Sequence, residues 1–149
     1  MPVAQSQTLD RNLPAVPSSI TPAARRKPAE WRDRALVTIR SYHSLLEDWD
    51  SYGGAELSPE VISHAVEFIN RVAEQLSVSE PNIEPHSQGY VRFEWVDDDR
   101  GLDLTVDVRP DGRLEYLFCD DEAGVEEERV GTIADVMHYL PEQYDRWSA

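Results

Sequence analysis

Two segments in the first half of the chain carry apolar residues at intervals of three or four, the spacing of one face of an α-helix. The first segment covers residues 30–48, and its stripe consists of Trp31, Ala35, Ile39, Tyr42, Leu45, Leu46 and Trp49. The second follows residue 58, and its stripe consists of Ile62, Ala65, Val66, Ile69, Val72, Ala73 and Leu76. The pattern predicts two amphipathic helices that pack as an antiparallel pair.

The second helix has a start signal in Ser58, Pro59 and Glu60. A serine hydroxyl can accept a hydrogen bond from an unpaired amide at the helix start, and proline suits the first helical position because it has no N–H. Glutamate in the first turn interacts favourably with the helix dipole. We therefore expect this helix to begin at Pro59.

The loop between the two helices holds Trp49, Asp50, Tyr52, Gly53 and Gly54. The glycine pair lets the backbone reverse, because glycine adopts positive φ without a steric penalty. We expect the two aromatic rings to cap the open end of the groove between the helices. We expect the carboxylate of Asp50 to accept hydrogen bonds from loop amides or from an indole N–H.

The second half of the chain changes to alternation of apolar and polar residues, which is the period of a half-buried strand. Three clear strands are predicted at residues 91–95, 102–108 and 114–118, and a weaker fourth at residues 126–130. Residues 97–101 and 110–112 are typical hairpin connections, rich in Asp and Gly. Phe93, Trp95 and Phe118 are assigned to the core.

A short last helix is predicted after the strands. Thr132 followed by Asp135 resembles a capping box, and Ile133, Val136, Met137 and Leu140 supply its apolar positions. Pro141 ends the helix, leaving Tyr144 and Trp147 beyond it. The fold class is therefore α+β, with a two-helix N-terminal hairpin, an antiparallel three- to four-stranded meander covered by helices on one face, and a short C-terminal helix.

Residues 1–29 are predicted to be a disordered proline-rich tail in front of a single domain of residues 30–149. Five prolines interrupt this segment, and its apolar residues follow no period. Arg25, Arg26 and Lys27 make its end basic. Two interpretations stay open: a solubilising leader, or an arm that docks on the acidic remainder of the chain.

The negative charge of the chain limits the classes of partner that it can bind. The formal net charge is −15, and residues 94–128 contain fourteen acids against three arginines. Such a field disfavours direct binding to nucleic-acid phosphate or to an anionic membrane, and it attracts basic proteins. One cysteine and the lack of an apolar run of about 20 residues favour a soluble cytoplasmic protein. The oligomeric state stays open.

The chain contains Trp-Asp-Ser-Tyr-Gly-Gly at residues 49–54, Ser-Pro-Glu at 58–60, Gly-Tyr-Val-Arg-Phe-Glu-Trp at 89–95 and Gly-Arg-Leu-Glu-Tyr at 112–116. In this order the motifs resemble a group of small acidic bacterial and phage-associated proteins with a Trp-Asp-Gly-Tyr-Gly-type motif. The resemblance covers roughly residues 45–140. It departs at Ser51, where glycine is expected. The resemblance implies no catalytic residue.

Metal and cofactor chemistry have little support in the sequence. A calcium loop counted from Asp97 needs glycine at its sixth position and glutamate at its twelfth, where Leu102 and Val108 stand. The four histidines are scattered, and neither a His-Glu-x-x-His motif nor a cysteine pair is present. We expect no metal and no cofactor.

Catalytic motifs are equally scarce. The chain has no Gly-x-Ser-x-Gly, and Cys119 lies beside acids that would raise the pKa of its thiol. Asp50, beside two aromatic rings, is the one carboxylate whose surroundings favour a shifted pKa. We assign no catalytic residue. A small enzyme with its site at the loop of residues 49–54, using Asp50, is kept as an alternative.

The acidic segments are the most distinctive feature that remains. We predict a non-enzymatic acidic interaction module, an inhibitor or accessory subunit for a basic partner that handles nucleic acid or acts as a toxin. Such a protein would act like an antitoxin or in phage defence or counter-defence, mimicking nucleic-acid phosphate. A structural assembly subunit and a merely solvated surface are the other interpretations. The candidate partner-binding residues are Asp97, Asp98, Asp99, Asp120, Asp121, Glu122, Glu126, Glu127 and Glu128.

Overall fold

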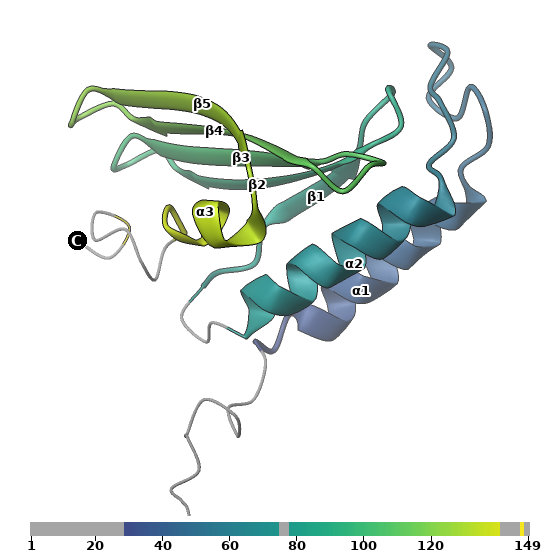
Figure 1. The fold of residues 1–149 in the computed structure, drawn as a ribbon, viewed down its shortest axis with the longest axis horizontal. Coiled ribbons are helices and arrows are strands. Elements are labelled where there is room, and N and C mark those ends of the chain that lie inside the picture. Colours follow the sequence, from purple (N-terminus) through teal and green to yellow (C-terminus); the bar gives the residue numbers. More distant parts are fainter. Residues whose placement is uncertain (1–28, 75–77, 141–146, 148–149) are drawn as a thin grey trace, which may run out of the picture.

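The computed structural model describes residues 29–74, 78–140 and 147, which form two layers (Figure 1). A sheet forms one layer, and the helices lie against one of its faces. The helices are α1 (Arg32–Ser41), the short 3-10 helix η2 (Tyr42–Ser44), α2 (Pro59–Ala73) and α3 (Ile133–Met137). The α+β class, the helical pair and the short C-terminal helix are confirmed.

The sheet is an antiparallel meander of five strands in sequence order. They are β1 (Asn82–Pro85), β2 (Val91–Asp97), β3 (Leu102–Val108), β4 (Leu114–Asp120) and β5 (Val125–Gly131). The weak fourth strand of the prediction is confirmed as β5. The prediction missed β1, which pairs with β2 alone. An edge strand of four residues ending at Pro85 has too little alternation to be recognised, and proline is tolerated at an edge.

The two long helices run antiparallel. The amide of Ala29, just before α1, donates to the carbonyl of Ala73 at the end of α2 over 2.7 Å. Ala29 is buried, so the folded part includes a residue that the sequence assigned to the tail. The rest of the predicted tail, with Arg25, Arg26 and Lys27, lies outside the described residues.

The first helix is shorter than predicted, ending at Ser41 rather than at Asp48. After η2 the backbone of Leu45 becomes extended, with φ −77° and ψ 117°. Hydroxyls of Thr38, Ser41 and Ser44 donate to carbonyls three or four residues earlier. Such bonds compete with the helical ladder and weaken a helix end. Leu46, assigned to the stripe, is therefore off the helix and 70% exposed.

Helix α2 begins as predicted, because the Ser58 hydroxyl accepts from the amide of Val61 over 3.1 Å and Pro59 is the first helical residue. Its buried face includes Phe68, which the predicted stripe omitted. The Phe68 ring lies 5.0 Å from that of Phe93 and 6.4 Å from that of Trp95, measured between centroids. The helix is thereby fixed to the middle of the sheet.

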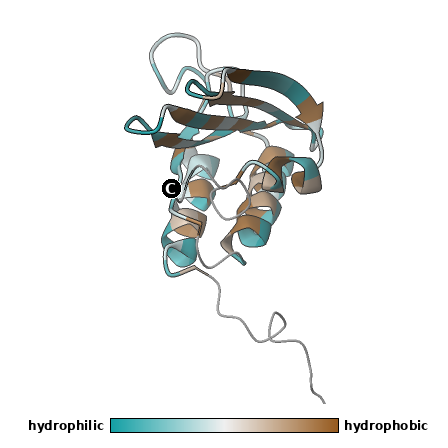
Figure 2. Cartoon of the chain, turned by 90° about the vertical axis from the view of Figure 1, so that its left-hand side faces the viewer, coloured by the Kyte–Doolittle hydropathy of each residue, from teal (hydrophilic) through white to brown (hydrophobic). Residues whose placement is uncertain are grey.

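Alternation along the strands separates the two faces of the sheet. The residues that face the helices are buried, and those between them are half-buried or exposed. Figure 2 shows this pattern as brown and teal segments along the same strands. The inner face contributes Val91, Phe93, Trp95, Leu102, Leu104, Val106, Val108, Leu114, Tyr116 and Phe118. The outer face is mostly polar, with Val96, Leu117 and Val130 exposed among the polar residues, as expected for a sheet covered on one side.

The chain returns to the core after β5. Thr132 and Asp135 form the predicted capping box at the start of α3, and Val136 and Leu140 are buried. The indole of Trp147 donates to the carbonyl of Tyr139 over 2.8 Å. Pro141 and Tyr144 lie outside the described residues. Within the part of the chain that the structure describes, no helix has both the length and the apolar character needed to cross a membrane.

Candidate interaction surface

Two acidic turns that are twenty residues apart in sequence lie side by side. They are the β2–β3 turn, residues 98–101, and the β4–β5 turn, residues 121–124. The amide of Asp121 donates to the carbonyl of Gly101 over 2.9 Å. A Cβ on Gly101 would lie 3.1 Å from that of Asp121, and Gly101 has a φ of +67°. A meander places every second turn at the same end of its sheet, so the fold gathers these acids.

The exposed members of this end are Asp98, Asp99, Asp121 and Glu122. Asp97 belongs to the same end but is half-buried, and its carboxylate accepts from the Arg100 guanidinium over 2.6 Å. That hydrogen bond lowers the pKa of Asp97 below its ordinary value. Asp97 therefore stays ionised and positions the turn, while the four exposed acids face solvent.

Two of the predicted partner-binding residues do not belong to an exposed surface. Asp120 is completely buried, and its carboxylate accepts from the amide of Ala123 over 3.1 Å. Glu127 is half-buried and points to the helix side, where it accepts from the Tyr139 hydroxyl over 2.5 Å and from Arg129 over 3.0 Å. These bonds, with that from Tyr139 first, lower the pKa of Glu127. The assignment of Asp120 as a contact residue is wrong because the carboxylate is needed inside the turn.

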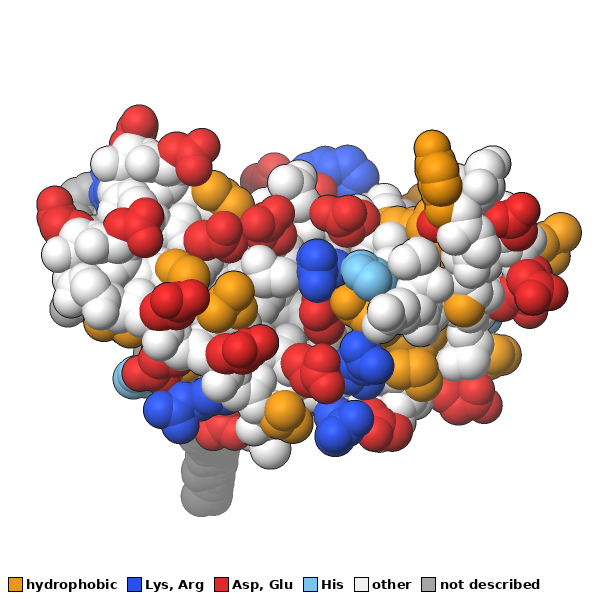
Figure 3. Space-filling model, turned by 90° about the horizontal axis from the view of Figure 1, so that it is seen from above, with side chains coloured by type: hydrophobic (Ala, Val, Ile, Leu, Met, Phe, Trp, Pro, Cys, Tyr) orange, Lys and Arg blue, Asp and Glu red, His pale blue; other side chains and the backbone are white. Residues whose placement is uncertain are grey.

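The outer face of the sheet carries the acidic surface further. Glu126 and Glu128 lie on it, opposite Cys119 and Leu117 of β4. The strand register adds to this face five acids that were not among the predicted contact residues: Glu84, Glu94, Asp103, Asp107 and Glu115. In Figure 3, which looks onto this face, red acidic side chains spread across the sheet with a few blue arginines among them. The polar positions of the predicted strands were the signal for four of these residues, whereas Glu84 lies on β1, which the prediction missed.

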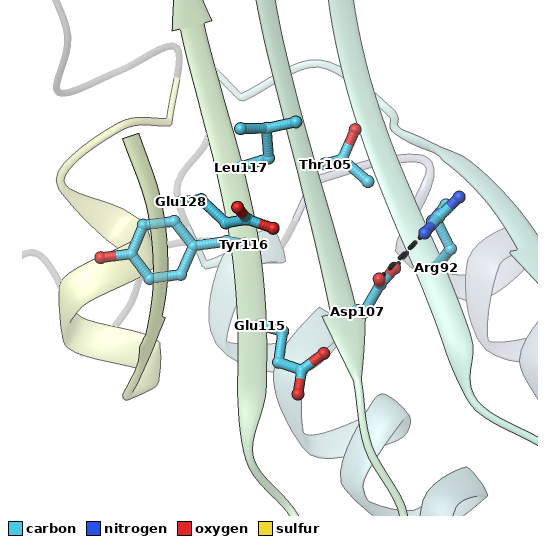
Figure 4. Close-up of a pocket in the computed structure, with 7 residues that line it drawn as sticks. All are labelled: Arg92, Thr105, Asp107, Glu115, Tyr116, Leu117 and Glu128. Atoms are coloured by element: carbon cyan, nitrogen blue, oxygen red, sulfur yellow. Dashed lines mark hydrogen bonds and ion pairs between the residues drawn. The ribbon is translucent and has the colours of Figure 1, made fainter. Parts of the chain in front are cut away.

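A shallow hollow of about 240 Å³ lies on this face (Figure 4). Arg92 and Asp107 form a two-pronged ion pair at one side of it, with distances of 2.7 and 3.0 Å. Glu115, Leu117 and Glu128 line the other side. Because Arg92 neutralises the charge of Asp107, Glu115 and Glu128 are the charged groups that this hollow presents to a partner.

Burial and neighbouring acids both favour the protonated form of two groups on the outer face. Burial raises the pKa of Glu94, and the charge and hydrogen bond of neighbouring Asp103 raise it further. Burial also raises the pKa of the Cys119 thiol, followed by the charges of Glu126 and Asp103. The direction for Cys119 is the one predicted from its acidic neighbours. Burial is thus the main cause of both shifts, and the neighbouring acids add to it.

In the loop of residues 49–54, the prediction for Asp50 is confirmed. Asp50 accepts hydrogen bonds from the amides of Tyr52 and Gly54 over 2.9 and 2.8 Å. The first of these bonds is the main cause of the lowered pKa of Asp50. The predicted cap on the helical groove is wrong, because Tyr52 is 91% exposed. Trp49 is half-buried, and its indole donates to the carbonyl of Ala55 over 2.8 Å.

The two glycines of the loop serve different needs. Gly53 has a φ of +82° with open space around it. Gly54 has no room for a side chain, since a Cβ would lie 2.7 Å from Oδ1 of Asp50 and 2.9 Å from the indole nitrogen of Trp49. Asp48 and Ser51 also have positive φ, 65° each. Ser51 thus adopts a backbone conformation that glycine takes up more readily than a residue with a Cβ.

Among the described residues, no group of three or more His, Cys, Asp or Glu side chains is arranged to hold a metal ion. Comparison of the chain with family models, with curated proteins and with solved structures gave no match. The geometry of the acidic surface is therefore the basis for a functional assignment.

Proposed function

We propose that this protein is a non-enzymatic acidic interaction module that binds a basic protein. The binding surface consists of the exposed turn acids Asp98, Asp99, Asp121 and Glu122 together with the outer sheet face, and is called the acidic surface below. The observation that carries the proposal is the hydrogen bond from Asp121 to Gly101, which joins two separate acidic turns. The acids of these two turns and those of the outer sheet face together form one extended negative region.

The physical basis is electrostatic. Like charges held close together repel each other and destabilise the fold, and the charge of Asp103 adds to the effect of burial in raising the pKa of Glu94. Solubility alone does not require acids to be adjacent, since a mixed surface serves as well. A basic partner gains from the concentrated field, because complementary charge speeds association and sets orientation.

The spacing of acids on the sheet supports mimicry of nucleic-acid phosphate as the mode of binding. Neighbouring strands lie about 4.8 Å apart, and residues two apart on a strand are separated by about 6.8 Å. Acids occupy several such positions on the outer face, with Asp103 and Glu126 on either side of Cys119. The favoured partner is thus a basic protein that handles nucleic acid, and the module is its inhibitor or accessory subunit.

The alternative of an enzyme at Asp50 has less support. A general base needs an available lone pair and a pKa near the working pH. Oδ1 of Asp50 already accepts two loop amides, and the pKa of Asp50 is lowered. These are the properties of a carboxylate that holds a loop together.

The test compares two charge reversals of equal size. Asp98→Lys with Asp121→Lys alters the acidic surface, and Glu67→Lys with Glu74→Lys alters exposed positions on α2 and at its C-cap by the same number of charges. Basic nucleic-acid-binding proteins are recovered with the tagged chain from its native cells, purified, and measured by surface plasmon resonance at several salt concentrations. We expect about ten-fold or more slower association for the first variant only, with a weaker salt dependence. Equal effects of both variants would refute the proposal.

A second arm tests phosphate mimicry. Adding the chain to the purified partner bound to a short DNA or RNA duplex is expected to release the duplex in proportion to occupancy. If the chain bound the partner without releasing the duplex, the interaction would be supported, but the nucleic-acid groove of the partner would be excluded as the binding site.

A further inference from the structure

The loop of residues 48–55, here called the motif loop, is held by several hydrogen bonds between its own residues. The amide of Asp48 donates to the carbonyl of Gly54 over 2.6 Å, and that of Ser51 to the carbonyl of Asp48 over 3.0 Å. The Asp48 carboxylate accepts from the amide of Gly53 over 2.7 Å. Together with the bonds of Asp50 and Trp49, these contacts fix the backbone of a loop that lies outside the core.

The motif loop is also tied to the sheet. The amide of Ala55 donates to the carbonyl of Ser87 over 2.7 Å, in the connection between β1 and β2. A Cβ on Gly89 would lie 3.3 Å from the carbonyl oxygen of Glu56. The β1–β2 connection is at the end of the sheet opposite to the acidic turns, as the registers of β2 and β3 require. The motif loop is therefore a second, separate region.

This organisation displays an aromatic side chain instead of burying it. Tyr52 is 91% exposed, whereas the residues on both sides of it hold strained or bonded conformations. Non-glycine residues at positive φ cost on the order of 1 kcal/mol each, and such strain concentrates at functional sites. A rigid loop that presents a tyrosine is suited to binding, because little conformational freedom remains to be lost when a partner docks.

The charge around Tyr52 indicates the kind of partner. No lysine or arginine occurs between Arg40 and Arg71, while Glu47, Asp48, Asp50 and Glu56 all lie within the loop and its flanks. Two of these carboxylates, Asp48 and Asp50, accept hydrogen bonds from the backbone amides of Gly53 and Gly54 beside Tyr52. A surface with a pocket for a phenol ring and a basic rim complements this arrangement.

We infer that the motif loop is a preformed contact surface that inserts Tyr52 into a pocket of a basic protein partner. The ring is the anchor, the hydroxyl reaches a polar group in the pocket, and the loop acids face the basic rim. The inference shares the partner class of the proposed function but uses the opposite end of the sheet. The two contacts can therefore be tested, and can fail, separately.

The first experiment places the photo-crosslinker p-benzoylphenylalanine at position 52 in the full chain, produced in its native cells. The matched control places it at position 37, where Val37 is exposed on α1. We expect one dominant adduct at position 52 that is absent at position 37, with a basic protein identified by mass spectrometry. No adduct, equal adducts at both positions, or an adduct with a second copy of this chain would overturn the inference.

The second experiment measures binding of variants to the partner that crosslinking identifies, purified without the crosslink. Tyr52→Ala is expected to weaken binding by about 30-fold or more, the loss typical of a central anchor of about 2 kcal/mol. Tyr52→Phe should lose only a few-fold, since the ring stays, and Val37→Ala should bind like the unchanged chain. Binding by Tyr52→Ala at full strength would overturn the inference, whatever the outcome at position 98.

The variant of Asp98→Lys with Asp121→Lys separates the two proposals. Loss of affinity in Tyr52→Ala but not in the turn variant would support the motif loop and refute the acidic surface. The reverse result would refute the motif loop and leave the acidic surface in place. Losses in both variants, additive in free energy, are expected for a partner that spans both ends of the sheet.

Discussion

Oδ1 of Asp50 lies 2.8 Å from the amide nitrogen of Gly54, and a Cβ on Gly54 would come within 2.7 Å of the same oxygen. The carboxylate therefore takes the space that any other residue at position 54 would need for its side chain. The two residues form one unit, in which the glycine provides both the donor and the room. Since the indole of Trp49 borders the same space, this unit determines the shape of the motif loop.

Gly54→Ala is expected to destabilise the protein by about 1–3 kcal/mol, because the methyl group displaces Asp50 from its hydrogen bonds. The measurement is urea unfolding of the single variants and of the double variant with Asp50→Ala. Once Asp50 is truncated, Gly54→Ala should cost clearly less. Gly53→Ala is the control, since its cost comes from positive φ and should be the same in both backgrounds. Equal costs of Gly54→Ala in the two backgrounds would contradict the unit.

Ser51→Gly should stabilise the protein by up to about 1 kcal/mol. Ser51 has a φ of 65°, a conformation that is unfavourable for a residue with a Cβ and natural for glycine. Ser51→Ala keeps the Cβ and is expected to bring no gain. A melting temperature that falls in Ser51→Gly would mean that the serine hydroxyl contributes more than the strain costs.

Trp49→Ala should cost about 1–2 kcal/mol, because the half-buried ring removes only part of its apolar area from water and makes one hydrogen bond to Ala55. Trp95→Ala is the matched control. Trp95 is 2% exposed and in contact with Phe68, so its truncation should cost about 3–5 kcal/mol. Chemical unfolding of both variants gives the comparison. A larger loss at Trp49 than at Trp95 would contradict the exposed position of the loop.

Glu94→Gln should be more stable than the unchanged chain at neutral pH by about 0.5 kcal/mol or less. The pKa of Glu94 is raised above 4.5 in the folded state, so the folded protein holds this proton more tightly than the unfolded chain. Stability from this group is present at low pH and falls as the pH rises through the interval between 4.5 and the raised value. The advantage of Glu94→Gln should therefore shrink on acidification.

Asp97→Asn should show the opposite pH dependence of stability in the same experiment. Because its bond to Arg100 lowers the pKa of Asp97, the ionised carboxylate stabilises the fold above its ordinary value of 3.8 and loses this contribution as the pH falls below it. The difference between Asp97→Asn and the unchanged chain should thus be largest at neutral pH and vanish in acid. Both variants are tested by melting curves from about pH 3 to about pH 7, a range that includes the ordinary pKa of Asp and Glu at about 4. Parallel pH profiles for the two variants would contradict the assignment.

Local patterns in the chain were sufficient for most of the secondary structure. Ser58 with Pro59 marked the start of α2, Thr132 with Asp135 marked α3, and alternation separated buried Phe93 from half-buried Glu94. These signals work because a cap or a pleat depends on residues only a few positions apart. For the same reason the amide acceptor role of Asp50 was predictable within its own loop.

What the amino-acid sequence alone determined is thus the element types, their order and the inner face of the sheet. Only the tertiary structure decided that Asp120 is buried while Asp121 is exposed, that residues 82–85 pair as an edge strand, and that Tyr52 faces solvent. It also decided that the turns around Gly101 and Asp121 meet. The physical reason is that burial and contact between distant segments depend on strand register and on the space left by neighbours, and neither is encoded within a short window of sequence.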